Sequence, residues 1–324
     1  PLSRFYSNNA ANLPKPFKAL QIGPVWRADR PQKGRFRQFY QCDIDILGDA
    51  TNLAEIELIL ATTTLLGKIG FSGFNVRIND RRILKAMAKY SGFPESQFDE
   101  VFIILDKMDK IGLDGVAEEL KKAGFEESSI QTYLKMFEEL KSQENGIAYI
   151  GEKLKDVLEG DAANNLQQIV SAVEQTTKSS FRLSFDPTLV RGMSYYTGTI
   201  FEIEMEGFPG SVAGGGRYDE MVGKFTNMQT PACGFSIGFE RIVTILLENG
   251  FEVPGTKKKK AYLIEKGVSA DRMGQALAKA MQERANGEQV LVTQMNKNKK
   301  FQKEQLMAEG YTEFEEFYKK EFLR

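Results

Sequence analysis

The sequence predicts an α+β protein in which helices flank an antiparallel sheet, a helical insertion interrupts that sheet, and a small α/β domain follows. Segments that alternate like strands lie on both sides of residues 91–180. That middle stretch is rich in Glu, Lys, Leu and Ala and has helical periodicity. A strand, a helix and a second strand then follow a lysine-rich linker. We therefore assign residues 1–254 to one domain, with the insertion at about 91–180, and residues 255–324 to a second, smaller domain.

The expected strands of the first domain are short segments in which apolar and polar residues alternate. They cover residues 18–26, the segment after Arg35, 74–78, 181–185, 199–205 and 232–237. Thr51 or Asn52 can cap a helix that continues to about Leu66, and Asp80 can cap the helix after the third strand. A last helix over 239–249 ends near Gly250, a residue type that favours helix ends.

The insertion and the second domain differ from this pattern. Helical periodicity in the insertion is broken at Gly92–Pro94, Gly112 and Gly124, and its many charges predict solvated faces. In the second domain a linker covers 254–260. The expected elements after it are a strand over 261–265, a helix over 270–284, a strand over 289–293 and a charged helical tail from Lys297.

The composition excludes several kinds of chemistry. The 324 residues contain no histidine, which excludes Ser-His-Asp and Cys-His catalysis and every His-ligated metal site. Cys42 and Cys233 lack any CxxC spacing, so we expect small core residues and a reducing cytoplasm. Forty-three basic and 44 acidic residues give a net charge of −1, so any contact with RNA must be local.

The chain has no apolar run that could span a bilayer and no visible signal peptide, so we expect a cytoplasmic protein. Its first residue is Pro1 and not Met. This indicates a fragment or a processed chain.

The first candidate site residues lie in the segment RFRQFYQCDIDIL. Side chains alternate between the two faces of a strand. One face would therefore carry Arg35, Arg37, Phe39, Gln41, Asp43 and Asp45. Four residues of strand span roughly 13 Å, about the reach from a nucleotide phosphate to an attached substrate. The alternative is an antiparallel edge strand with a solvated polar face, and the pattern alone favours this alternative.

The loop before that strand, RADRPQKGR, carries four cations around Pro31 and Gly34. Guanidinium groups bind phosphate oxygens through two parallel hydrogen bonds, so Arg27 and Arg35 are candidates for a nucleotide site. An exposed turn is equally compatible with the loop alone.

Three further blocks follow in the sequence. LVRGMSYYTG places Arg191 between an apolar run and the pair Tyr195 and Tyr196, which can line a pocket or pack in a hairpin. AGGGRYD, which ends with Tyr218 and an acid, has three glycines that permit close approach to a ligand but also suit any tight turn. GFSIGFER places Arg241 in the first turn of a helix, where N–H groups favour an anion; the alternative is a surface arginine beside an acid.

Together these blocks resemble a known family. WRADRPQKGRFRQFYQCDIDILG resembles motif 2 of the class II aminoacyl-tRNA synthetases, and GFSIGFER resembles motif 3. LVRGMSYYTG and AGGGRYD resemble two signatures peculiar to the histidyl-tRNA synthetases. The similarity covers roughly residues 1–250, including the DKMDKIG segment of the insertion. Four blocks in this order are specific, and the resemblance is to an N-terminally incomplete member.

The resemblance implies a class II synthetase sheet and a two-step reaction. Histidine and ATP give histidyl-adenylate and pyrophosphate, and the histidyl group then passes to tRNA(His). By position, Arg27 resembles the arginine on the α-phosphate and carboxylate, Arg191 the family's catalytic arginine, and Arg241 the arginine on the far phosphates, with Arg35 also on ATP. The histidine pocket implied is Gln41, Asp45, Tyr195, Tyr196 and Tyr218. Mg²⁺ is implied as the partner of ATP, without protein ligands of its own.

Three departures from the family limit what the resemblance implies. The dimer-forming motif 1 and an acidic loop would precede Pro1, so we expect a homodimer only when the N-terminus is complete. Ser194 stands where many members carry an acid. The C-terminal unit resembles an anticodon-binding domain but ends early, so no anticodon contacts are assigned.

Two other functions share this fold. One is the catalytically silent regulatory subunit of ATP phosphoribosyltransferase, in which the ATP-binding arginines are expected to be eroded. The other is a domain that senses uncharged tRNA. Because Arg27, Arg191 and Arg241 are all present, the sequence favours the ligase.

Overall fold

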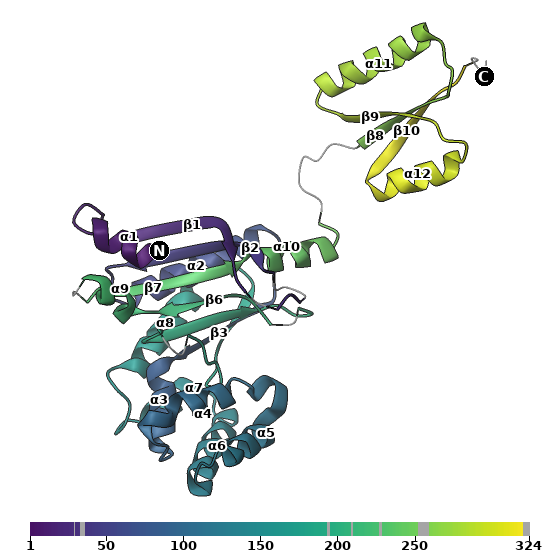
Figure 1. The fold of residues 1–324 in the computed structure, drawn as a ribbon. Helices are drawn as coiled ribbons and strands as arrows, with labels where there is room; N and C mark the ends of the chain where they lie inside the picture. The colour runs from purple at the N-terminus through teal and green to yellow at the C-terminus, as the bar shows by residue number, and fades with distance from the viewer. Residues whose placement is uncertain are drawn as a thin grey trace. The chain divides into compact units, whose positions relative to one another are not determined.

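The computed structural model describes residues 1–28, 30–32, 36–192, 195–208, 210–226, 229–251 and 259–319. The chain divides into two compact units, Pro1–Leu246 and Leu247–Arg324, which we describe separately (Figure 1). In the described part of the chain, we find no helix with the length and apolar character needed to cross a membrane.

The first unit is built on a mainly antiparallel sheet. Among the described residues seven strands take the order β1-β2-β7-β6-β5-β3-β4, and only β3 and β4 pair in parallel. The strands are β1 (Phe17–Trp26), β2 (Gln38–Leu47), β3 (Phe74–Asp80), β4 (Phe181–Phe185), β5 (Thr199–Glu204), β6 (Ser211–Arg217) and β7 (Ala232–Gly238). This sheet, flanked by helices, confirms the predicted fold class.

Helices cover one face of the sheet and form the insertion. They are α1 (Leu2–Asn9), α2 (Leu53–Lys68), α3 (Arg81–Tyr90), η1 (Glu95–Gln97), α4 (Phe98–Leu105), α5 (Met108–Lys122), α6 (Glu127–Lys141), α7 (Gly146–Lys153), α8 (Ala162–Thr176), α9 (Asp219–Thr226) and α10 (Phe239–Glu248). α2 packs against β2 and β7, and α8 packs against α2 and β3. The apolar side chains of β2 and β7, such as Ile46 and Phe235, belong to the core on this side.

Between β3 and β4 the chain is helical, and its buried side chains continue the core of the sheet. Tyr133 is fully buried and meets Phe93 and Phe137 edge-on, with ring centroids 5.3 and 5.1 Å away. α5 is kinked at Gly112, whose φ of 68° lies in the left-handed region that favours glycine. The kink separates the first turn of α5 from the rest of the helix, at one of the predicted breaks.

The second unit has a parallel sheet of order β10-β8-β9. Its elements are β8 (Lys259–Ile264), α11 (Ala270–Ala285), β9 (Gln289–Gln294), α12 (Lys299–Ala308) and β10 (Tyr311–Phe317). Side chains of β8 alternate, because Ala261 and Leu263 pack with Leu306 of α12 while Tyr262 packs with Ala280 of α11. The two helices therefore cover opposite faces of this small sheet (Figure 1).

The structure corrects several sequence-based expectations. The triple glycine is neither a tight turn nor a loop, because it lies in the middle of β6. The tail after Lys297 is only partly helical and ends in β10, whose acids pair with lysines of α11 and α12. LVRGMSYYTG is not part of a hairpin, because β3 lies between the strands on either side of it. Of the two candidate caps for α2, the Asn52 side chain makes no capping hydrogen bond, whereas Thr51 Oγ1 accepts from the backbone N–H of Leu53 at 3.3 Å.

Candidate active site

The candidate site lies on the sheet face opposite α2. Strand pairing places Asp45 beside Gly234 and Gly234 beside Gly216. One step along, Asp43 lies beside Ser236 and Ser236 beside Gly214. Residues directly opposite in an antiparallel pair point to the same face, so this face is lined by polar side chains and glycines. The predicted alternation of β2, with Gln41, Asp43 and Asp45 on one face, is confirmed.

Asp45 is held by two hydrogen bonds at one end of this face. The Tyr218 hydroxyl donates to Asp45 Oδ1 at 2.5 Å, and Gln21 Nε2 donates to Oδ2 at 3.1 Å. Burial raises the pKa of Asp45 to about 6, and the two hydrogen bonds oppose this shift. A Cβ on Gly234 would lie 2.1 Å from Asp45 Oδ1, so only glycine leaves room for the carboxylate.

Next to Asp45, hydrogen bonds link the side chains of Arg27, Gln41 and Asp43 in a row. Arg27 Nη2 donates to Gln41 Oε1 at 3.3 Å, and Gln41 Nε2 donates to Asp43 Oδ2 at 2.6 Å. The Arg27 guanidinium also lies 4.9 Å from the centre of the Phe39 ring, in range for a cation–π contact. Burial raises the pKa of Asp43, while hydrogen bonds from Ser236 and Gln41 oppose the shift.

Arg191 lies over β6. Its Nε donates to Glu202 Oε2 of β5, and its Nη2 donates to Ser211 Oγ at 2.5 Å. A Cβ on Gly214 would lie 2.7 Å from the Arg191 guanidinium carbon, so this glycine admits the arginine. Burial alone would lower the pKa of Arg191, but the hydrogen bond and charge of Glu202 outweigh it and raise the pKa. Arg191 therefore stays cationic.

Arg241, on α10, also binds Ser211. Its Nη1 donates to the backbone oxygen of Ser211, and it lies in the first turn of that helix, as predicted. The acid next to it in sequence, Glu240, accepts a hydrogen bond from the backbone N–H of Tyr40 at 2.6 Å. Arg191 and Arg241 thus meet at Ser211 and bring two cations to one end of the face.

Tyr195 and Tyr196 differ in exposure. Their ring centroids are 4.4 Å apart, and the Tyr195 side chain is exposed while Tyr196 is largely buried. Burial raises the pKa of Tyr196 and of Tyr218, so both hydroxyls remain hydrogen-bond donors. Tyr196 packs against the cluster that contains Tyr218 and against the backbone of Gly192, where a Cβ would clash with its ring.

Arg217 is a structural residue that the sequence analysis did not single out. It donates from Nε and Nη2 to the two carboxylate oxygens of Glu55, both at 2.6 Å, and from Nη1 to Asp219 at 3.2 Å. The Glu55 side chain is 1% exposed. This buried pair ties α2 to the end of β6, immediately before Tyr218. The position of Arg217 beside Tyr218 in AGGGRYD was the available clue; nothing in the sequence pointed to Glu55 or Glu202.

All the residues that the sequence analysis assigned to the site, apart from Arg35, lie along this face or at its ends. Arg35 lies outside the described residues, as do Met193 and Ser194. The described part of the chain has no group of three acidic or cysteine side chains that could hold a metal.

Cations at one end of the face and hydrogen-bonded carboxylates at the other suit a substrate with an anionic group and a polar, basic one. An antiparallel sheet with this face open and helices behind it is the fold of the class II aminoacyl-tRNA synthetases. The chain belongs to the histidyl-tRNA synthetase family, because the family model described as "Histidyl-tRNA synthetase" matches residues 2–242.

Individual relatives agree with this family. Over 250 residues the chain is 45% identical to the histidine–tRNA ligase of Leifsonia xyli subsp. xyli. This match covers 76% of this chain and 58% of that protein. It is 39% identical over 261 residues to the histidine–tRNA ligase of Aeropyrum pernix, and this match covers 77% of this chain and 56% of that protein. The chain thus spans less than two thirds of the length of these curated relatives.

Two solved structures have the same fold. The histidyl-tRNA synthetase of Nostoc sp. PCC 7120 has a TM-score of 0.70 and 25% identity over 96% of this chain and 72% of that one. A Bacillus halodurans C protein described as an ATP phosphoribosyltransferase regulatory subunit/histidyl-tRNA synthetase has a TM-score of 0.71 at 22% identity, covering 98% and 77%. At that identity the second comparison supports the fold alone.

Proposed function

We propose that this chain carries the adenylate-forming centre of a histidine–tRNA ligase. The observation that supports this most directly is the division of one glycine-lined face into a carboxylate end at Asp45 and a cationic end at Ser211. Histidine offers an imidazole and a carboxylate, and ATP offers the phosphates, so the two ends match the two substrates.

In this proposal Asp45 and the hydroxyls of Tyr196 and Tyr218 recognise the imidazole ring. A buried carboxylate that accepts a hydrogen bond from a ring N–H discriminates strongly against side chains without such a donor. Gln41 is assigned to the amino-acid backbone, because its amide lies between Arg27 and Asp43. Tyr195, whose ring contacts that of Tyr196 at an angle of 58°, is assigned to close the pocket from the solvent side.

The arginines are assigned to the reacting phosphates. The carboxylate of histidine attacks the α-phosphorus of ATP, and pyrophosphate leaves in line. Positioning and charge stabilisation supply most of the catalysis in such a step. Arg27 is assigned to the α-phosphate and the carboxylate, Arg191 to the charge that develops on the α-phosphate, and Arg241 to the far phosphates, with Arg35 also on ATP. Mg²⁺ would enter bound to ATP and neutralise phosphate charge.

The second step and the partners belong to the same proposal. The histidyl group passes from the adenylate to the terminal adenosine of tRNA(His). We assign residues 1–254 to the catalytic core and residues 255–324 to a unit like an anticodon-binding domain. The free cysteines suit a cytoplasmic location.

We also propose that the protein forms a homodimer, because the edge strand β1 exposes apolar side chains. β1 has its apolar side chains Leu20, Ile22 and Trp26 exposed by 61–68%. An exposed apolar edge strand is a surface that proteins usually cover with a partner.

The test is histidine-dependent exchange of pyrophosphate into ATP. It is measured on this chain and on a version extended at the N-terminus to the length of the curated relatives. Exchange with histidine alone among the amino acids supports the ligase. A folded, extended chain that gives no exchange would favour the regulatory subunit instead, and binding to an ATP phosphoribosyltransferase would then be measured.

A further inference from the structure

Arg77 of β3 is a buried residue outside the candidate site with four side-chain partners. Its Nε donates to Asp186 Oδ2 at 2.5 Å, its Nη1 to Glu204 Oε1 at 2.5 Å and to Asp109 Oδ2 at 3.0 Å, and its Nη2 to Thr188 Oγ1 at 3.3 Å. Burial would lower the pKa of Arg77, but the three carboxylates raise it. The guanidinium is therefore a fixed cation that joins three parts of the chain.

The first part is the segment that leads to Arg191. The backbone N–H of Asp186 donates to Ile78 of β3 at 2.9 Å, and Asp186 Oδ1 accepts from the N–H and hydroxyl of Thr188 at 2.8 and 2.6 Å. Asn79, also on β3, donates to the backbone oxygen of Leu189 at 3.1 Å. The segment is thus held against β3 until two residues before Arg191.

The second part is the strand that carries the acid on Arg191. Glu204 and Glu202 are two apart on β5 and point to the same face. Arg77 lies directly opposite Glu202 in the pairing of β3 with β5. Arg77 therefore fixes both the backbone approach to Arg191 and the strand from which Glu202 binds its guanidinium.

The third part is the helical insertion. Asp109 lies in the first turn of α5, before the kink at Gly112, and its side chain is 64% exposed while Arg77 is 8% exposed. Burial raises the pKa of Asp106, just after α4; the charge of Glu202 adds to this shift, and the charge of Arg191 opposes it.

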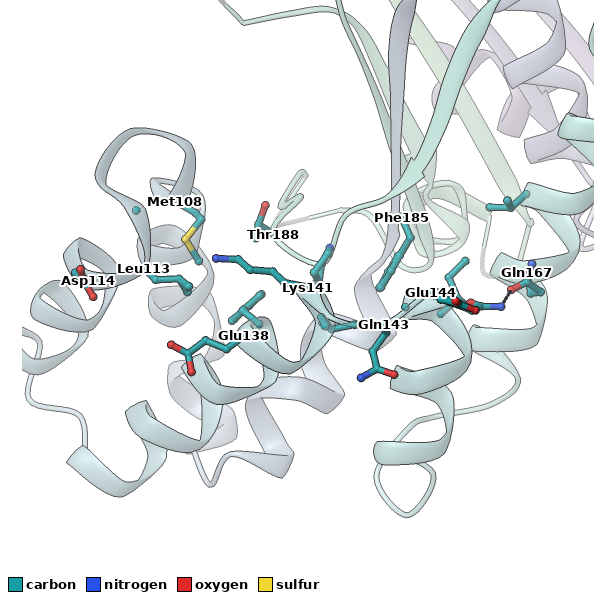
Figure 2. A pocket seen from close by; sticks show the side chains of 18 of the residues that line it. Met108, Leu113, Asp114, Glu138, Lys141, Gln143, Glu144, Gln167, Phe185 and Thr188 are labelled. Atoms are coloured by element: carbon teal, nitrogen blue, oxygen red, sulfur yellow. Dashed lines mark hydrogen bonds between the residues drawn. The ribbon is translucent and has the colours of Figure 1, made fainter.

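A cavity of about 970 Å³ lies beside the corner between α4 and α5. Figure 2 shows Met108 and Leu113 on the helical side and Phe185 and Thr188 on the side of the sheet, with Lys141 between them. Side chains do not fill the space beside this corner. The exposed carboxylate of Asp109 can leave Arg77 at small cost, since Asp186 and Glu204 still neutralise the buried cation.

We propose that Arg77 is a positioning residue for Arg191 and that Asp109 is the contact through which the helical insertion acts on it. This inference rests on the proposed role of Arg191 in adenylate formation. A displacement of about 1 Å in a catalytic group can slow a reaction about 100-fold, so a small shift of this corner changes the rate without opening the site.

The test compares Asp109→Asn with Asp114→Asn, a matched change on the same helix at an exposed acid. Pyrophosphate exchange gives kcat and KM, and hydrogen–deuterium exchange of the backbone amides of residues 188–191 gives a readout that does not need activity. We expect Asp109→Asn to lower kcat about tenfold, with KM for histidine and ATP within about twofold, and to speed amide exchange in that segment. Asp109→Glu should restore both, and Asp114→Asn should match the unaltered chain.

Arg77→Lys is the second variant, because lysine keeps the charge but cannot bridge three carboxylates. We expect a larger loss of kcat than in Asp109→Asn. If Asp109→Asn and Asp114→Asn give equal rates and equal amide exchange, the proposal is wrong. If the folded chain extended at the N-terminus shows no histidine-dependent exchange while Asp109→Asn still loosens residues 188–191, the proposed function fails and the coupling stands.

Discussion

Tyr218 and Asp45 are joined by a 2.5 Å hydrogen bond that passes over Gly234. Asp45 lies in β2 and Tyr218 follows β6, with β7 between them. A Cβ on Gly234 would lie 2.1 Å from Asp45 Oδ1 and 3.1 Å from Tyr218 Cε1. The missing side chain of the middle strand therefore lets its two neighbours meet.

Gly234→Ala should separate this pair. The new methyl group displaces the carboxylate, so we expect KM for histidine to rise roughly tenfold, the equivalent of one lost hydrogen bond to a charged group. Histidine-dependent pyrophosphate exchange measures this. Gly274→Ala, in α11 where a Cβ meets nothing within 4 Å, is the control and should leave KM unchanged. Equal KM values for the two variants would contradict the prediction.

Asp45 should make stability depend on pH. Its pKa is about 6 in the folded chain and 3.8 for an ordinary Asp, so between these values the folded chain holds a proton that the unfolded chain has released. Stability from this group is therefore present at low pH and lost as pH rises to about 6, by on the order of 3 kcal/mol. Urea unfolding at pH 4.5 and 7.5 should show a smaller loss in Asp45→Asn. A loss equal to that of the unaltered chain would refute the assignment.

Asp45 should also set the pH profile of activity. If the ionised carboxylate binds the imidazole, kcat/KM for histidine falls as pH drops below about 6, where Asp45 takes up a proton. Tyr218→Phe removes a hydrogen bond that lowers the pKa of Asp45, so the fall should begin at higher pH in that variant. A profile that does not move would count against Asp45 as the ionising group.

Arg191→Ala should slow adenylate formation while the chain still folds. Loss of one preorganised donor to a developing charge costs about 100- to 1,000-fold in kcat. Single-turnover formation of the adenylate measures the step directly. The control is Arg182→Ala, an exposed arginine of β4 whose hydrogen bond goes to Asn75. Near-normal turnover in Arg191→Ala would remove Arg191 from the mechanism.

Glu55→Ala should destabilise the first unit strongly. It leaves Arg217 buried without its main carboxylate, a loss of about 3 kcal/mol or more in the free energy of unfolding. Glu57→Ala, on the same helix, breaks only the half-exposed pair with Lys18 and should cost less than about 1 kcal/mol. Urea unfolding of both variants checks the difference. Similar losses would mean that burial of the Glu55–Arg217 pair carries no special weight.

The sequence alone could predict the parts of the fold that depend on local pattern. β1 and β2 alternate regularly, so their pairing and the shared face of Gln41 and Asp45 were predictable. β6 was not, because a run of glycines carries no hydrophobic period and has poor strand propensity. It becomes a strand because β5 and β7 pair with it on both sides, and glycine is needed there because a Cβ on Gly215 would lie 2.0 Å from the backbone oxygen of Gly234.

The partners of the site residues could not be predicted from the pattern. Glu202 and Arg191 meet only because β5 pairs with β6, and the Ser211 that joins Arg191 to Arg241 is an ordinary residue in the sequence. The roles of Arg27, Arg191 and Arg241 came from the resemblance. β10 was missed because its Glu residues, which look solvated, pair with lysines from the neighbouring helices.

The order of the strands also has a consequence for folding. The hydrogen bond from Tyr218 to Asp45 joins two residues that are 173 positions apart in the sequence. Most of the residues between them do not belong to the strands that form the site. Pairing over such a separation is slow, because chain entropy is lost before the contacts form. The helical insertion can fold on local contacts while this pairing is still absent. A nascent chain on the ribosome that ends before β7 therefore lacks the candidate site, even when its helices have formed.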